Sequence, residues 1–128
     1  MRAENILAEL NIQNLSSQNF NKISGGERQL VLIARALMQK SKIILLDEPS
    51  SHLDFKNTHL IMDILNQLKR KHKIVVTALH DPNLAYRYSD RIIIFKDGKI
   101  IASGSTEKVM TEELLSQAYE MDIKFSKA

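Results

Sequence analysis

The chain has 128 residues, of which 44% are hydrophobic and 26% are charged, a balance typical of one globular domain and not of a disordered segment. The net charge of +3 does not by itself indicate a nucleic-acid partner, so none is expected. The absence of cysteine excludes disulfides and thiolate metal sites. Apolar runs such as Leu30–Ala34 are far shorter than the roughly 20 residues that a membrane-spanning helix needs. A role at a membrane would therefore require docking from the cytoplasm.

The first third of the chain predicts two helices and a strand. Residues 3–10 are expected to form a short helix, and residues 11–21 form a polar loop. Apolar residues recur at helical spacing over residues 27–39, namely Leu30, Ile33, Ala34, Leu37 and Met38. Residues 42–47 form a continuous apolar run that ends in an acid, which is typical of a strand buried on both faces of a parallel sheet.

The middle of the chain completes a strand–helix–strand unit. Residues 56–70 carry an apolar stripe with helical spacing, made by Leu60, Ile61, Ile64, Leu65 and Leu68. A second apolar strand follows over residues 74–79 and ends at His80. Such a crossover implies that the two strands pair in parallel.

The last third predicts helices around a hairpin. Residues 81–89 are expected to be a short helix with Asp81 as N-cap and Pro82 at its first position. Strands over residues 91–95 and 99–102 are joined by Asp97-Gly98, a strong hairpin signal, and residues 106–119 form one or two helices. The predicted class is therefore α/β: a parallel sheet flanked by helices, with a C-terminal hairpin and helices.

Ser24-Gly25-Gly26-Glu27 opens the helix of residues 27–39 in a way that admits two interpretations. Ser24 as N-cap and Glu27 reaching back would form a capping box, which is a sufficient structural explanation. A cap does not require glycine, however, and consecutive glycines let backbone N–H groups approach an anion at the positive end of a helix. A terminal phosphate is a plausible ligand for this segment.

Asp47 and Glu48 stand where the strand of residues 42–47 ends, and ligands of open α/β sheets bind beyond that edge. Phosphoryl transfer needs a carboxylate to hold Mg²⁺ and a second group to position the attacking water. Two adjacent acids could divide these tasks, or they could simply mark the exit from the strand. Pro49, which fixes the backbone directly after the pair, favours the first interpretation.

His80 ends the neighbouring strand, at the same edge of the sheet if the pairing is parallel. A histidine there can donate to a phosphate oxygen or orient water. Asp54 could contact the site or could be the N-cap of the helix that follows it.

Taken in order, these segments resemble the ATP-binding cassette (ABC) family. Residues 23–27 are similar to its signature motif, and residues 43–48 resemble its Walker B strand with the catalytic glutamate. Residues 51–54 are similar to its D-loop, and His80 to its switch histidine. Three residues depart from the commonest pattern, namely Ile23, Glu27 and His52.

The resemblance implies part of a P-loop NTPase fold, with residues 1–40 in the helical signature subdomain and residues 41–128 in the catalytic core. The tail over residues 104–115 is similar to ATPases of iron-siderophore, haem and cobalamin importers. The family's phosphate loop, G-x-x-x-x-G-K-[ST], does not occur in this sequence. The chain is therefore expected to be a C-terminal portion of the domain that binds ATP weakly on its own.

The resemblance also assigns roles. Asp47 is expected to organise Mg²⁺, Glu48 to polarise water and His80 to contact the γ-phosphate of ATP. Ser24, Gly25, Gly26, Glu27 and Asp54 are expected to contact nucleotide. The implied partners are a second ATPase subunit, arranged head to tail, and transmembrane permease subunits at the inner face of the cell membrane. The alternatives are a non-catalytic module that pairs with complete ATPase subunits, or a gene remnant.

Overall fold

The computed structural model describes residues 25–126, so Ser24 and the predictions for residues 3–10 and 11–21 lie outside the described residues. The chain divides into two units, Met1–His80 and Asp81–Ala128. The described elements of the first unit are α2 (Gly25–Met38), β1 (Ile43–Asp47), α3 (Phe55–Arg70) and β2 (Ile74–Ala78).

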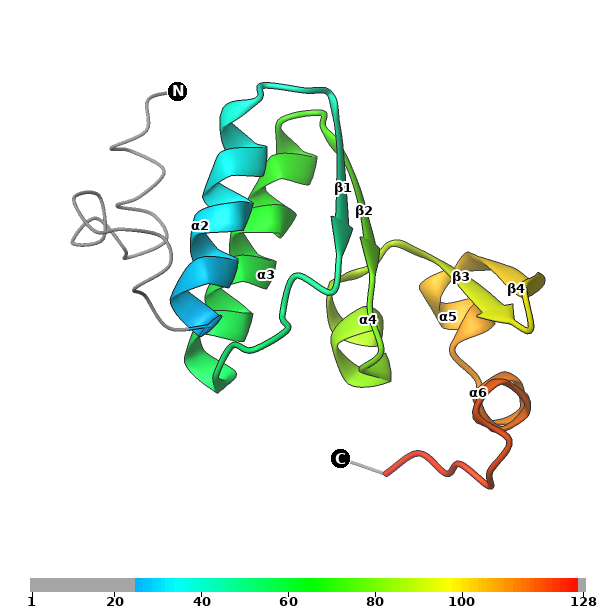
Figure 1. Cartoon of the computed structure of the whole chain (residues 1–128). Helices are drawn as coiled ribbons and strands as arrows, with labels where there is room; N and C mark the ends of the chain where they lie inside the picture. The colour runs from blue at the N-terminus through cyan, green and yellow to red at the C-terminus, as the bar shows by residue number, and fades with distance from the viewer. Residues whose placement is uncertain (1–24, 127–128) are drawn as a thin grey trace. The chain divides into compact units, whose positions relative to one another are not determined.

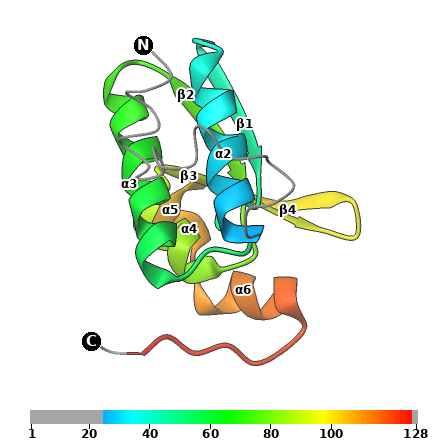
Figure 2. The same ribbon diagram turned by 60° about the vertical axis from the view of Figure 1, so that its left-hand side comes forward.

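In the first unit, β1 and β2 pair in parallel, with Ile43 opposite Ile74 and Asp47 opposite Ala78. The predicted strand–helix–strand crossover is thus confirmed. Helices α2 and α3 lie side by side on one face of the strand pair (Figures 1 and 2). Because the strands are parallel and in register, both carboxyl ends lie at the same edge of the sheet.

The core of this unit lies between the two helices and the covered face of the strands. Its buried residues are Leu30, Ile33, Ala34, Leu37, Ile44, Ile61, Met62, Ile64, Leu65 and Leu68. The helical periodicity therefore predicted most of the buried stripe. Met38 is an error of that prediction: it is the last residue of α2 and is 44% exposed.

The opposite face of the strands is exposed. Ile43, Leu45, Ile74 and Val76 are between 52% and 72% exposed, while Ile44, which alternates with them, is buried. The expectation that residues 42–47 are buried on both faces is therefore wrong for this structure. The alternation of side chains along a strand puts Ile44 under the helices, and no described residue of this unit covers the side that carries Leu45.

The second unit contains α4 (Pro82–Tyr88), β3 (Arg91–Lys96), β4 (Lys99–Ser105), α5 (Thr106–Val109) and α6 (Glu112–Tyr119). Asp81 caps α4 by accepting a hydrogen bond from the backbone N–H of Asn83 at 2.8 Å, as the sequence predicts. β3 and β4 form the predicted antiparallel hairpin, and Asp97 and Gly98 at its turn have φ of 52° and 74°. Both central residues of the turn thus adopt the left-handed conformation that the Asp-Gly pair favours.

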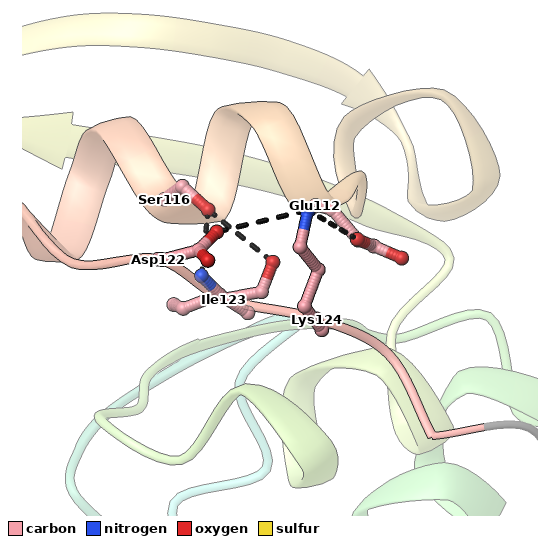
Figure 3. A network of polar contacts seen from close by, with 5 residues as sticks. All are labelled: Glu112, Ser116, Asp122, Ile123 and Lys124. Carbon is pink, nitrogen blue, oxygen red and sulfur yellow. Dashed lines mark hydrogen bonds and ion pairs between the residues drawn. The ribbon is translucent and has the colours of Figure 1, made fainter.

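The segment after α6 folds back onto that helix. The Ser116 hydroxyl accepts a hydrogen bond from the backbone N–H of Ile123 at 2.9 Å (Figure 3). The Lys124 ammonium lies 3.7 Å from carboxylate oxygens of both Glu112 and Asp122. The reversal of the chain occurs at Glu120, whose φ of 55° ends the helix in a left-handed residue.

No helix over residues 25–126 is both long enough and apolar enough to cross a membrane.

Candidate functional site

Glu48 and His80 meet at the carboxyl edge of the β1–β2 pair. The Glu48 backbone N–H donates to the Ala78 carbonyl at 2.9 Å, which extends the strand pairing one residue beyond β1. Glu48 Oε1 then lies 3.3 Å from His80 Nε2. The Glu48 side chain is 25% exposed and that of His80 is 93% exposed. An ion pair this exposed adds little stability, so its importance is that it brings an acid and an imidazole together at the edge.

Asp47 is the last residue of β1, and it is exposed, as are the neighbouring positions Leu45 and Ala78 on its side of the strands. The predicted acid pair is therefore split: the Asp47 carboxylate lies on the uncovered side, whereas Glu48 is half-buried. The two carboxylates are thus available for different tasks.

A single carboxylate can bind Mg²⁺ only together with ligands that do not come from these residues, such as phosphate oxygens and water. Over residues 25–126 no group of three His, Asp or Glu side chains could hold a metal ion. Mg²⁺ is commonly held by one or two carboxylates together with substrate phosphates and water. The exposed Asp47 fits that arrangement as the one protein ligand, with oxygens of a nucleotide completing the set.

Residues 48–54, here called the post-strand turn, run from Glu48 to the start of α3. Glu48 has a φ of 51° and His52 a φ of 64°, both in the left-handed region that side chains other than glycine rarely adopt. The Ser51 backbone N–H donates to the Glu48 carbonyl at 3.0 Å. Pro49 is among the fully buried residues of the chain. These contacts fix an unfavourable backbone conformation directly at the candidate catalytic acid.

Asp54 ends this turn as the N-cap of α3. Its Oδ1 accepts a hydrogen bond from the backbone N–H of Asn57 at 2.8 Å. The capping alternative that the sequence offers is thus confirmed, and a contact of Asp54 with nucleotide stays a prediction.

The two glycines at the start of α2 have different surroundings. A Cβ on Gly26 would lie 2.9 Å from the His52 carbonyl oxygen, so the close approach of the helix to the post-strand turn requires glycine there. A Cβ on Gly25 would meet nothing nearer than 3.9 Å. Packing therefore accounts for Gly26, whereas Gly25 has space around it for an approaching anion. Glu27 lies in the first turn of α2, and its capping partner, Ser24, lies outside the described residues.

Sequence reasoning missed Gln29. Its side-chain amide Nε2 donates to the carbonyl oxygens of Glu48 at 3.1 Å and Pro49 at 3.2 Å. The only sequence signal is a polar residue directly before Leu30 in the apolar stripe of the helix; its half-burial is visible only in the structure. The bond spans 19 residues of sequence, so local pattern could not identify its partner.

An α/β unit with an acid pair and a histidine at the carboxyl edge of parallel strands is typical of nucleotide-hydrolysing proteins. Comparison with known proteins refines this class. Residues 1–51 match the model of the ABC transporter family. The chain is 40% identical over 123 residues to the "Probable iron chelatin transport ATP-binding protein" of Helicobacter pylori, covering 95% of this chain and 48% of that protein. It is 37% identical to a hemin import ATP-binding protein, HmuV, of Shewanella denitrificans, covering 93% of this chain and 49% of that protein.

Solved structures of ABC transporter proteins are also similar to this chain. The structure described as "An inward-facing conformation of a putative metal-chelate type ABC transporter" matches with a TM-score of 0.82 and 33% identity, covering 92% of this chain and 47% of that one. The dimeric bacterial cassette MJ0796 matches with a TM-score of 0.76 and 36% identity, covering 81% of this chain and 45% of that one. The chain belongs to the ABC transporter ATPase family, and it spans about half the length of the curated relatives that it matches.

Proposed function

We propose that this chain supplies the hydrolytic residues and the signature segment of the ATPase subunit of an importer. The transported substrates would be iron-siderophore complexes, haem or cobalamin. The observation that carries the proposal is the meeting of Glu48 and His80, 3.3 Å apart, at the carboxyl edge of the parallel strands. The relatives named for iron chelatin and hemin transport support the first two substrate classes.

In this proposal each group at the edge has a separate task in ATP hydrolysis. The Glu48 carboxylate orients a water molecule and takes its proton while the water oxygen attacks the γ-phosphorus and the bond to the β-phosphate oxygen breaks. His80 Nε2 holds the Glu48 carboxylate before nucleotide arrives and donates to the γ-phosphate when it is present. The imidazole is highly exposed, so an incoming phosphate oxygen could reach it. Asp47 would hold Mg²⁺, which neutralises charge on the phosphates.

The rest of the nucleotide site would come from outside these residues. The sequence contains no G-x-x-x-x-G-K-[ST] segment, so a phosphate loop is assigned to another part of the assembly. Ser24, Gly25, Gly26 and Glu27 would face the γ-phosphate held by a second ATPase subunit, in a head-to-tail dimer. The dimeric form of the similar MJ0796 cassette supports this arrangement. Permease subunits would hold the pair at the inner face of the membrane.

Reconstitution from two polypeptides tests this function. The second polypeptide is the part of the Helicobacter pylori relative that this chain does not match. We expect ATP turnover when both polypeptides are present and none with either alone. Association of the two without any turnover would contradict the proposal.

A second candidate function is a non-catalytic module that pairs with complete ATPase subunits through the Gly25 end of α2, and the open surroundings of Gly25 favour it. Its test is ATP-dependent association of the chain with a complete relative, measured by size-exclusion chromatography. Gly25→Glu should prevent that association because it places a negative charge where the γ-phosphate would bind. Association with a complete relative, combined with inactive reconstituted halves, would favour the module over the hydrolytic subunit.

A further inference from the structure

Glu48 adopts a backbone conformation that it would not keep without support. Its φ of 51° lies in the left-handed region, and it precedes Pro49, a context that favours extended backbone. Such a residue persists only where the surrounding structure over-determines it. The structure must therefore contain groups that hold this part of the post-strand turn.

Two of these groups belong to the neighbouring backbone. The Glu48 N–H is held by the Ala78 carbonyl at 2.9 Å, and the Glu48 carbonyl accepts from the Ser51 N–H at 3.0 Å. Neither contact involves α2. They fix where the turn leaves the strand, but they do not connect it to the helix that begins at Gly25.

Gln29 makes that connection. Its amide Nε2 donates to two successive carbonyls, those of Glu48 and Pro49, from a half-buried position. The next residue, Leu30, is 4% exposed and anchors this turn of the helix in the core. The amide thus acts from a rigid element on the residue whose carboxylate faces His80.

A second contact joins the same two segments one turn earlier. Gly26 lies so close to the His52 carbonyl that a Cβ there would be 2.9 Å from the oxygen. The first two turns of α2 therefore touch the post-strand turn at both of its left-handed residues, Glu48 and His52. A displacement of the helix N-terminus would be transmitted to the Glu48 backbone.

We infer that Gln29 is a positioning residue, which holds Glu48 in its left-handed conformation and couples its carboxylate to the Gly25–Gly26 end of α2. The functional part of this inference rests on the proposed role of Glu48 in ATP hydrolysis. Gln29 does not touch the reacting atoms in this account. It acts through the backbone of Glu48, and its loss should lower turnover more than nucleotide binding.

The first arm of the test uses the chain itself and needs no ATP hydrolysis. Gln29→Met keeps the length and helix propensity of the side chain and removes both donors. We expect the Glu48 Cα and carbonyl chemical shifts to move toward ordinary values and the Ser51 amide to exchange faster with solvent. Gln67→Met, at an exposed position of α3, is the matched control and should leave both unchanged.

The second arm measures steady-state ATP turnover in the reconstituted pair described above. Gln29→Met should lower kcat about tenfold, with KM for ATP changed less than about twofold, because misplacement of a catalytic group affects the chemical step. Gln29→Lys, which retains a donor of similar reach, should recover part of that loss. If Gln29 had a role in folding alone, Gln29→Lys would not recover kcat relative to Gln29→Met when the two variants have the same melting temperature.

The outcomes are separable. Unchanged Glu48 shifts in Gln29→Met would overturn the inference, whatever the activity. Altered shifts with an unchanged kcat would overturn the coupling to catalysis. A wild-type pair without turnover would count against the proposed function, and the spectroscopic arm would still decide whether Gln29 holds Glu48.

Discussion

The two faces of the β1–β2 pair carry similar side chains in different surroundings. Ile44 lies under α2 and α3 and is 6% exposed, whereas the adjacent Leu45 points to the other side and is 72% exposed. Both belong to the apolar run that ends at Asp47. The difference shows that the sequence of β1 fits a sheet covered on both faces, while the described residues of the first unit cover only one. An apolar surface of this kind is typical of a contact face.

The largest expected effect is the difference in stability between substitutions at these two neighbouring positions. Ile44→Ala should destabilise the chain by about 2–5 kcal/mol, because it leaves a cavity under the helices. Leu45→Ala should change the free energy of unfolding by less than about 1 kcal/mol, because Leu45 is already in water. Urea denaturation of both variants measures the difference. Equal costs would mean that the two faces are not distinct.

The same two substitutions can be compared again after the reconstituted partner polypeptide has been added. We expect the cost of Leu45→Ala to rise toward that of Ile44→Ala, by roughly 1–3 kcal/mol, if the partner covers the exposed face. The measurement is the midpoint of urea denaturation of the complex. A midpoint that is insensitive to Leu45→Ala would place the partner elsewhere.

The two glycines of α2 allow a similar comparison at the site. Gly26→Ala should cost about 1–3 kcal/mol because its methyl group would overlap the His52 carbonyl oxygen. Gly25→Ala has space for its methyl group and should alter stability by no more than about 0.5 kcal/mol. Thermal denaturation checks both variants. Destabilisation by Gly25→Ala as large as that of Gly26→Ala would show that packing also explains Gly25.

Asp54→Ala should cost about 1 kcal/mol, because it removes the acceptor for the Asn57 N–H at the start of α3. Asp54→Asn keeps an acceptor oxygen and is the matched control. At the same pH it should lower the free energy of unfolding by only about a few tenths of a kcal/mol. Urea denaturation again provides the measurement. If the two variants lose equal stability, the carboxylate charge matters more than the cap.

The smallest effect is expected in the second unit. Lys124→Met should change stability by less than about 0.5 kcal/mol, because its two contacts are long and exposed. Ser116→Ala removes the acceptor of the Ile123 N–H and should cost about 1 kcal/mol. If thermal denaturation shows a larger loss of stability for Lys124→Met than for Ser116→Ala, then charge, not the hydroxyl, holds the final segment.

The features that sequence predicted have local causes. The stripe of α3, the Asp81-Pro82 helix start and the Asp97-Gly98 turn each depend on residues a few positions apart. The edge shared by Glu48 and His80 followed from one further rule, the parallel pairing of a strand–helix–strand unit.

The features that sequence missed arise from contacts distant in the chain. The Gln29 bonds to the post-strand turn and the approach of Gly26 to His52 each join segments separated by about 20 residues or more, and these contacts accompany the left-handed conformation of Glu48. The exposure of Leu45 also depends on what covers the strand and not on its composition. No periodicity within a single element encodes these contacts.

The most direct test of the account is ATP turnover by Glu48→Gln in the reconstituted pair, with nucleotide binding measured in parallel. Glu113→Gln, an exposed position in α6, matches the change in charge. The account predicts a loss of kcat of about 100-fold or more for Glu48→Gln, with ATP binding retained, and no loss for the control. Turnover by Glu48→Gln equal to that of the wild-type pair would contradict the assignment of the hydrolytic centre to this edge.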